Sequence, residues 1–208
     1  MNHLKQLILT LFSLAYTNVF SQTTMPDNLK NEFSISTTSL TLNNLSLRYY
    51  RSIDQNLWFK IGLINLSGGN RKTNPDSPLN YPTENKYFNG GLSMGLEKRK
   101  FINDKLELTL GADLQATYNY INIYTNNPNI SEDRRIDKDK KFMPGLGFTI
   151  GGYCHFNDHF SLGFEISPRV LYYSEDYKSY LNNNNYKTSG FDYSFSSNNI
   201  LFEIKYFW

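Results

Sequence analysis

The chain has 208 residues, which suits a single domain, and its 21 lysines and arginines almost balance 19 acidic residues, for a formal net charge of +2. This balance excludes a strongly basic nucleic-acid-binding protein and an acidic disordered tail. The mean hydropathy of −0.52 excludes a bundle of membrane helices, and the single cysteine excludes an internal disulfide and a cysteine-based zinc site.

The first predicted element is a secretory signal peptide over residues 1–21. Lys5 supplies a positive charge, residues 7–16 form an uncharged apolar run, and small residues surround a cleavage site after Ser21. The apolar run has about half of the ~20 residues that a membrane helix needs, which disfavours a membrane anchor. We therefore expect a cleaved leader and one β-barrel domain over residues 22–208.

The remaining sequence alternates apolar and polar residues with a period of two. Between Leu106 and Tyr120, every even position is leucine, alanine or tyrosine, and every odd position is polar or glycine. This period is typical of β-strands with two different faces. Eight strands are predicted, at about 33–42, 45–52, 57–67, 87–100, 106–122, 142–156, 160–174 and 190–208.

Short and long connections alternate between these strands. Tight turns are predicted at 53–56, 102–104 and 157–158, and long polar loops at 68–86, 123–141 and 175–189. Such asymmetry is typical of a transmembrane β-barrel whose termini lie on the side of the short turns.

Two irregularities interrupt the pattern. Pro168 falls within a strand, where it removes a ladder hydrogen bond, and predicts a bulge or a change of register. The apolar phase also shifts between Phe195 and Ile200.

A soluble barrel and a membrane barrel would both show this alternation. Three features favour the membrane barrel: many glycines, serines and threonines at the polar positions, aromatic residues at both strand ends, and equal numbers of acids and bases on the polar face. Buried charges need partners, so we predict a paired network inside a plugged lumen. Its ten residues are Arg48, Lys60, Glu97, Arg99, Glu107, Asp113, Glu165, Arg169, Glu203 and Lys205.

The C-terminus carries the most specific motif. Every second residue back from the terminal tryptophan is apolar or aromatic: Ile200, Phe202, Ile204, Tyr206 and Trp208. This segment resembles the signal in the last strand that the barrel-assembly machinery of bacterial outer membranes recognises. With the leader, strand count and loop asymmetry, the mature chain resembles the small eight-stranded outer-membrane β-barrel proteins, the OmpA transmembrane-domain and Opa/PorT-like group. The resemblance implies the outer membrane of a Gram-negative bacterium and contact with the assembly machinery.

The sequence offers no convincing catalytic, cofactor or metal site. His155 and His159 flank a predicted turn, but no further ligand accompanies them, which favours a solvated turn over a metal site. In the charged segment 123–141, four basic residues are candidates for contacts to lipid phosphates, although a solvated loop is the simpler interpretation. They are Arg134, Arg135, Lys140 and Lys141.

We therefore predict an all-β, eight-stranded, antiparallel up-and-down transmembrane β-barrel in the cell outer membrane, without enzymatic activity. Its expected role is structural or in surface interaction. The alternatives are a narrow channel, a component of a secretion or envelope-assembly machine, and a soluble ligand-binding barrel. Outer-membrane lipid and the assembly machinery are the expected partners, with no nucleic acid and with any extracellular or periplasmic protein partner unidentified.

Overall fold

The computed structural model describes residues 30–38, 44–73, 81–127, 136–179, 184–194 and 200–208, so the predicted signal peptide lies outside it. Among these residues there is no helix with the length and apolar character needed to span a membrane. They form ten β-strands: β1 (Asn31–Thr37), β2 (Leu45–Asp54), β3 (Leu57–Thr73), β4 (Thr83–Asn103), β5 (Leu106–Thr125), β6 (Ile136–His155), β7 (Phe160–Ile166), β8 (Arg169–Ser179), β9 (Asn184–Ser194) and β10 (Ile200–Phe207).

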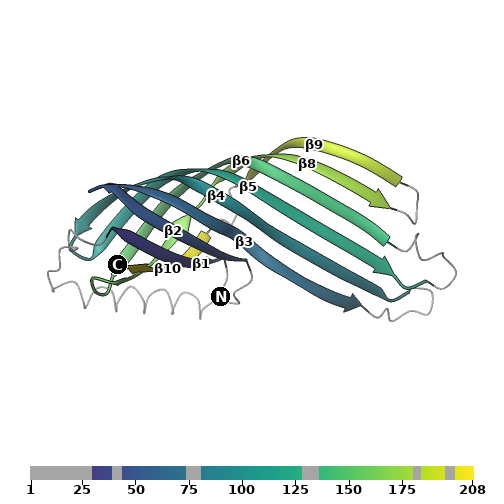
Figure 1. Ribbon diagram of the computed structural model, residues 1–208, viewed down its shortest axis with the longest axis horizontal. Coiled ribbons are helices and arrows are strands. Elements are labelled where there is room, and N and C mark those ends of the chain that lie inside the picture. The colour runs from purple at the N-terminus through teal and green to yellow at the C-terminus, as the bar shows by residue number, and fades with distance from the viewer. Residues whose placement is uncertain (1–29, 39–43, 74–80, 128–135, 180–183, 195–199) are drawn as a thin grey trace, which may run out of the picture.

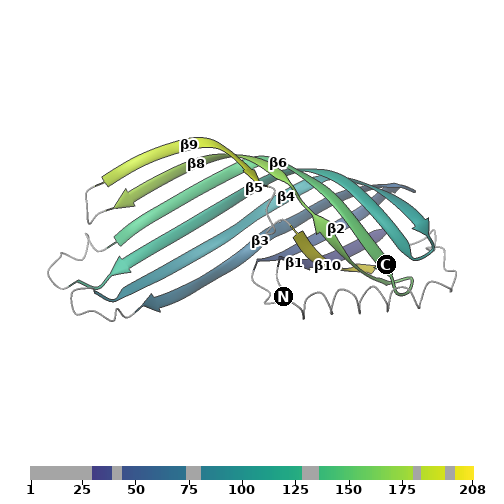
Figure 2. The same cartoon turned by 180° about the vertical axis from the view of Figure 1, so that it is seen from behind.

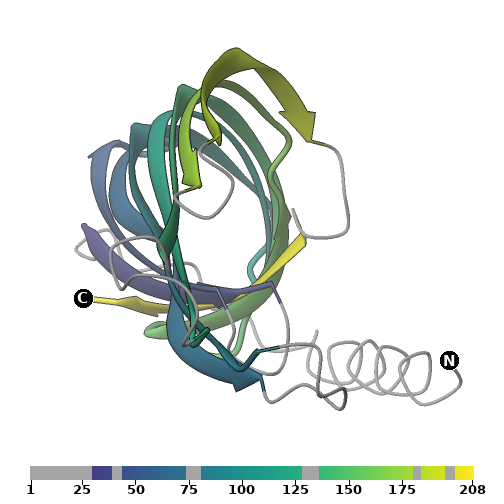
Figure 3. The ribbon, with the colours of Figure 1, turned by 90° about the vertical axis from the view of Figure 1, so that its right-hand side faces the viewer.

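Eight of these strands close into a ring. Consecutive strands pair from β1 to β7, β7 then pairs with β10, and β10 returns to β1, with every pairing antiparallel. Figure 3 shows the ring from one end. The remaining strands continue two of the eight, since β8 follows β7 and β9 precedes β10 along the chain. The predicted eight-stranded antiparallel barrel is therefore confirmed.

Pro168 interrupts its strand without moving the register. Ile150 of β6 pairs with Ile166 before the proline, and Gly147 pairs with Arg169 after it, so each strand advances by the same number of residues. The amide nitrogen of Phe148 still donates to the Pro168 carbonyl at 2.8 Å. The predicted bulge or register change is wrong, because the proline removes one donor and inserts no extra residue.

The last predicted strand does change its phase. Ser194 of β9 lies opposite Arg169, and Ile200 of β10 lies opposite Ile166. The chain advances six positions from Ser194 to Ile200, whereas the partner strand advances only three between Ile166 and Arg169. An odd offset exchanges the two faces of a strand. Accordingly, the even-numbered Asp192 of β9 lies opposite the buried Leu171, whereas the odd-numbered Leu201 and Glu203 are buried in β10, which confirms the phase shift.

The strands continue well beyond the ring as an open, curved sheet of six strands, β3, β4, β5, β6, β8 and β9 (Figure 1, right-hand side; Figure 2 shows the same from behind). We call this part the extension. The prediction of long loops at 68–86, 123–141 and 175–189 is wrong in most positions, since β3 reaches Thr73 and β4 begins at Thr83. Period-two analysis missed these segments because polar residues occupy both of their faces.

Burial in the ring is inverted relative to a water-soluble barrel. Outward leucines such as Leu110 and Leu114 are 61% and 60% exposed, whereas the inward Glu97 is fully buried. Aromatic rings gather outside near the short turns. The ring centroid of Tyr206 lies 5.8 Å from that of Trp208 and 5.1 Å from that of Phe160. An apolar exterior with aromatic side chains at its margin, around a charged interior, is the arrangement of a transmembrane β-barrel. The prediction of a transmembrane β-barrel is confirmed.

Candidate functional site

Arg99 is the centre of a buried ionic network inside the ring. Its side chain extends from β4 and donates through Nη1 to Glu32 of β1 and through Nε to Glu97, two residues earlier on β4, at 2.9 Å. Glu107 lies 3.7 Å from the same Nε, and the guanidinium covers the Trp58 ring with its central carbon 4.0 Å from the ring centroid. Strand alternation points Arg99 and the three glutamates inward, so that three carboxylates share one arginine.

Two lysines extend the network around the wall. Lys205 of β10 lies 3.3 Å from Glu32 and 3.7 Å from Glu97. Lys60 of β3 lies 2.9 Å from Asp113 and donates to the Thr149 hydroxyl at 2.9 Å. Lys205 and Glu32 lie on neighbouring strands, but the other three contacts connect strands that are not neighbours in the ring, so the network crosses the lumen as well as following its wall.

A second cluster surrounds Arg48 of β2. Its Nη1 donates to Glu165 of β7, and Glu203 of β10 lies 3.8 Å away. Glu203 also accepts from the hydroxyl groups of Tyr50 and Tyr153. Because the Lys205 ammonium lies 3.6 Å from the centre of the Tyr153 ring, the two tyrosines connect this cluster to the one around Arg99.

The structure thus brings together nine of the ten residues predicted for the lumen. Arg169 stands apart: it is not fully enclosed, its Nε has no hydrogen-bond partner, and it is attracted by the negative charge of Asp192 on β9. Glu32 and His155 pair with charges of the network but were absent from the predicted set. Glu32 was missed because it precedes the expected first strand, although Glu32, Ser34 and Ser36 alternate with Phe33 and Ile35.

His155 is the other missed residue, and the expectation of a solvated turn is wrong for it. The ring is only 6% exposed, its Nε2 lies 2.9 Å from Glu107, and it packs between Phe101 and Phe207. His155 continues the inward parity of Tyr153, which could have identified it. His159 lies outside the lumen and stacks on Tyr206. No cluster of three or more metal-ligating side chains occurs in the described part of the chain.

The network holds more acidic than basic groups. Four permanent cations, Arg48, Lys60, Arg99 and Lys205, face six carboxylates: Glu32, Glu97, Glu107, Asp113, Glu165 and Glu203. The described side chains of this interior pair with one another through ion pairs and hydrogen bonds, so the interactions within it are electrostatic.

The four basic residues predicted to contact lipid phosphates do not share one position in the structure. Arg134 and Arg135 lie outside the described residues. Lys140 is exposed on the outer face of β6, whereas Lys141 points to the opposite face, with its ammonium 4.4 Å from the centre of the Tyr173 ring. Of the two candidates that the structure describes, Lys140 is the one that faces the side on which lipid would lie.

The inner face of the extension continues from the lumen wall and carries aromatic and acidic side chains. The rings of Tyr177 on β8 and Tyr186 on β9 stack with centroids 4.8 Å apart. Nearby, partial burial and the negative charge of Glu175 raise the pKa of Asp139 above its ordinary value. Tyrosines with a few charged groups are common in protein-binding surfaces.

The predicted C-terminal signal lies on the outer wall. Ile200, Phe202, Ile204 and Tyr206 alternate with buried residues along β10, and each is between 38% and 56% exposed. Trp208 is also exposed, and its amide and carbonyl both bond with Asn31 at the start of β1. The segment is therefore both the closing strand of the ring and part of its apolar exterior.

Comparison with known proteins adds little to this description. The chain matches no protein-family model and no curated protein. Among solved structures, it is similar to Ail, the attachment invasion locus protein of Yersinia pestis, with 10% identity, a TM-score of 0.38 and coverage of 86% of this chain and 95% of that one. It is also similar to CarO of Acinetobacter baumannii, with 10% identity, a TM-score of 0.35 and coverage of 86% and 96%. The assignment of the barrel rests on strand pairing and burial within this chain.

Proposed function

We propose that this protein is an outer-membrane barrel with a lumen closed to ions, which holds its extension outside the cell as a surface for contact with other molecules. It acts without catalysis and without a cofactor. Its assembly uses the C-terminal strand, from Ile200 to Trp208, as the recognition segment for the barrel-assembly machinery.

The buried network is the observation that supports a closed lumen. Large charged side chains such as Arg99, Lys60 and Lys205 are at most 1% exposed, and the aromatic rings of Tyr50 and Trp58 lie against them. A barrel of eight strands is just wide enough for its side chains to fill. An ion would have to break several short ion pairs to pass.

The extension supports the role in contact. The 21 residues of β4 span about 70 Å at ~3.3 Å per residue, whereas a membrane needs strands of about 9–11 residues. The additional length lies away from the short turns, on the side that faces outward in barrels of this type. A purely structural membrane barrel has no need of these additional residues.

Two alternatives make different predictions. A narrow channel requires that the ionic network open, and a component of a secretion or envelope-assembly machine requires a stable partner in the envelope. The compact network around Arg99 disfavours the channel, and the length of the extension beyond the ring favours a contact on the extracellular side.

Conductance in planar bilayers tests the closed lumen. Protein that migrates faster on gels without boiling is taken as folded and is added to the bilayer. We expect no stable conductance steps at moderate voltage. Regular single-channel steps from the folded protein would refute the closed lumen and support the channel.

Cysteine labelling on intact cells tests the orientation. Lys187→Cys places a thiol on the outer face of β9, and Gln55→Cys places one in an exposed short turn, both with Cys154→Ser. A membrane-impermeant maleimide should label position 187 on intact cells and position 55 only after permeabilisation. The reverse pattern would place the extension in the periplasm and refute the proposed role.

A further inference from the structure

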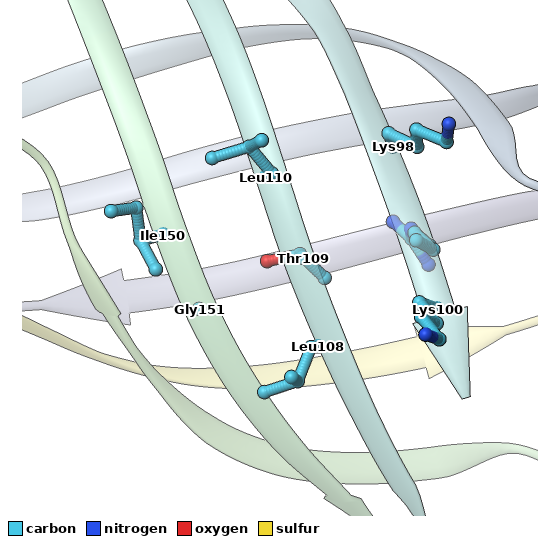
Figure 4. A pocket seen from close by; sticks show the side chains of 8 residues that line it. Lys98, Lys100, Leu108, Thr109, Leu110, Ile150 and Gly151 are labelled. Carbon is cyan, nitrogen blue, oxygen red and sulfur yellow. The ribbon is translucent and has the colours of Figure 1, made fainter. Parts of the chain in front are cut away.

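A groove of about 320 Å³ lies on the outer wall of the ring, near the end that carries the short turns. Three adjacent strands form it, and Figure 4 shows Lys98 and Lys100 on β4 beside Leu108 and Leu110 on β5 and Ile150 on β6. The three apolar side chains point outward and are between 49% and 61% exposed. The groove is thus an apolar furrow bordered on one side by two lysines.

The two lysines are unusual for their position. Lys98 and Lys100 alternate with the buried Arg99, so both point toward lipid, opposite Leu110 and Leu108 of the next strand. No ion pair joins either lysine to a carboxylate among the described residues. The outward positions of β5 from Leu106 to Tyr118 and of β6 from Phe142 to Cys154 carry no acidic residue. No outward acidic residue on the described parts of β5 and β6 therefore offsets the positive charge of these two lysines.

The depth of Lys98 and Lys100 in the membrane limits which groups could neutralise their charges. Lys100 and Lys98 lie three and five residues before the end of β4 at Asn103, which is about 10 Å and 17 Å along the strand. Strand tilt shortens these distances along the membrane normal, and a lysine side chain extends its ammonium toward the interface. Lysine is costly at the centre of a bilayer and tolerated near its surface. Both ammonium groups therefore reach the lipid headgroups on the side of the short turns.

We propose that this groove is a binding site for an anionic phospholipid of the periplasmic leaflet. One acyl chain lies in the furrow between Leu108, Leu110 and Ile150, and Lys98 and Lys100 bind the headgroup phosphate. The site deepens the proposed function, on which it rests, because it gives the barrel a fixed lipid partner on the side opposite the extension.

The observations favour this occupant over two others. A protein partner would have to enter the apolar band of the membrane wall, where lipid chains already cover outward side chains such as Leu110. The phosphates of the outer-leaflet glycolipid would lie at the other end of the barrel, far from Lys98 and Lys100. Charge complementarity and depth both point to a phospholipid of the inner leaflet.

Native mass spectrometry of the full chain in detergent micelles tests the site. The folded protein receives phosphatidylglycerol or phosphatidylcholine at equal concentration, with the same acyl chains. We expect about tenfold tighter retention of phosphatidylglycerol, in line with the attraction of basic residues to anionic lipid. The preference should decrease with added salt, which is measured on the wild-type protein and needs no variant.

Matched variants assign the preference to the groove. Lys98→Gln with Lys100→Gln should bring the ratio of the two lipids close to one. Lys86→Gln with Lys140→Gln removes two outward lysines from the other end and should leave the preference unchanged. Ile150→Trp fills the furrow while keeping both lysines, and should weaken retention of both lipids.

Three results would overturn the site: equal retention of both lipids by the wild-type protein, an unchanged preference in the Lys98 and Lys100 variant, or the same loss in the Lys86 and Lys140 variant. Gel mobility without boiling reports the folded barrel independently. A folded protein without lipid preference contradicts this site alone, whereas a protein that never folds in detergent or bilayers contradicts the proposed membrane barrel.

Discussion

Nη1 of Arg48 donates to both carboxylate oxygens of Glu165, at 2.9 Å and 3.0 Å, across 117 residues of sequence. The arginine is 4% exposed and the glutamate fully buried, so both have lost almost all of their water. A buried pair of this kind contributes little beyond the cost of desolvating its members, but either member alone is strongly unfavourable. The pair therefore specifies how β2 and β7 face each other across the lumen.

Replacing one member of this pair should cost more than replacing both. Arg48→Met leaves the Glu165 charge buried without its partner and should lower the free energy of unfolding by about 3–5 kcal/mol. The double variant Arg48→Met, Glu165→Met should recover at least about 1 kcal/mol of that loss. Urea unfolding in lipid vesicles measures both. A double variant less stable than either single one would contradict this account.

Arg99→Ala should be among the most destabilising single changes in the ring. It removes one cation from contact with Glu32, Glu97 and Glu107, and we expect a loss of about 3–5 kcal/mol. The exposed Lys86 on the same strand is the control, since Lys86→Ala should change stability by no more than about 0.5 kcal/mol. The remaining side chains should keep the lumen closed, so folded Arg99→Ala should give no single-channel steps. Equal stability of the two variants would contradict a shared network.

Two glycines, one on the crowded inner face and one on the open outer face, should respond differently to an added methyl group. A Cβ on the inward Gly62 would lie 2.6 Å from the carbonyl oxygen of Leu47 and 2.7 Å from Cγ of Arg48. Gly62→Ala should therefore cost about 1–3 kcal/mol through displaced backbone. A Cβ on the outward Gly152 would meet nothing closer than Phe164 at 3.6 Å, so Gly152→Ala should be nearly neutral. Unfolding in vesicles distinguishes the two, and equal losses would refute the assignment of the faces.

The extension should become more stable as the pH falls below neutrality. Burial and the nearby Glu175 raise the pKa of Asp139 above its ordinary 3.8, so the folded extension binds this proton more tightly than the unfolded chain does. Protonation therefore favours the folded form, increasingly as the pH falls from 7 towards 3.8. The rate of proteolytic cleavage in the extension, compared with Asp139→Asn at each pH, isolates this effect. A ratio of the two rates that does not change with pH would contradict it.

The alternation of residues predicted the ring well because lipid and lumen impose opposite demands on its two faces. Every even residue of β5 up to Tyr118 had to be acceptable to acyl chains, and this requirement is visible in sequence. In the extension both faces meet water, so Ile123 and Tyr124 carry no alternating signal, and this end of β5 was expected to be a loop.

Strand parity also predicted which charges point inward, but not which of them meet. Lys60 of β3 contacts Asp113 of β5 inside the lumen because ring closure and strand register bring them together. A local sequence pattern holds no information about either. Arg169 has the inward parity yet lies apart from the network, since its height on β8 and the offset of β9 place it near Asp192 instead. Height along the barrel is the quantity that alternation does not encode.

The pairing of β1 with β10 joins residues at least 165 positions apart, from Thr37 with Phe202 to Glu32 with Phe207. During synthesis, the segment Asn31–Thr37 therefore emerges long before its partner exists. Until then the nascent sheet has two unsatisfied edges, each able to recruit a strand from another molecule. The ring therefore cannot close until β10 is present, and a delay before closure keeps both edges open to aggregation.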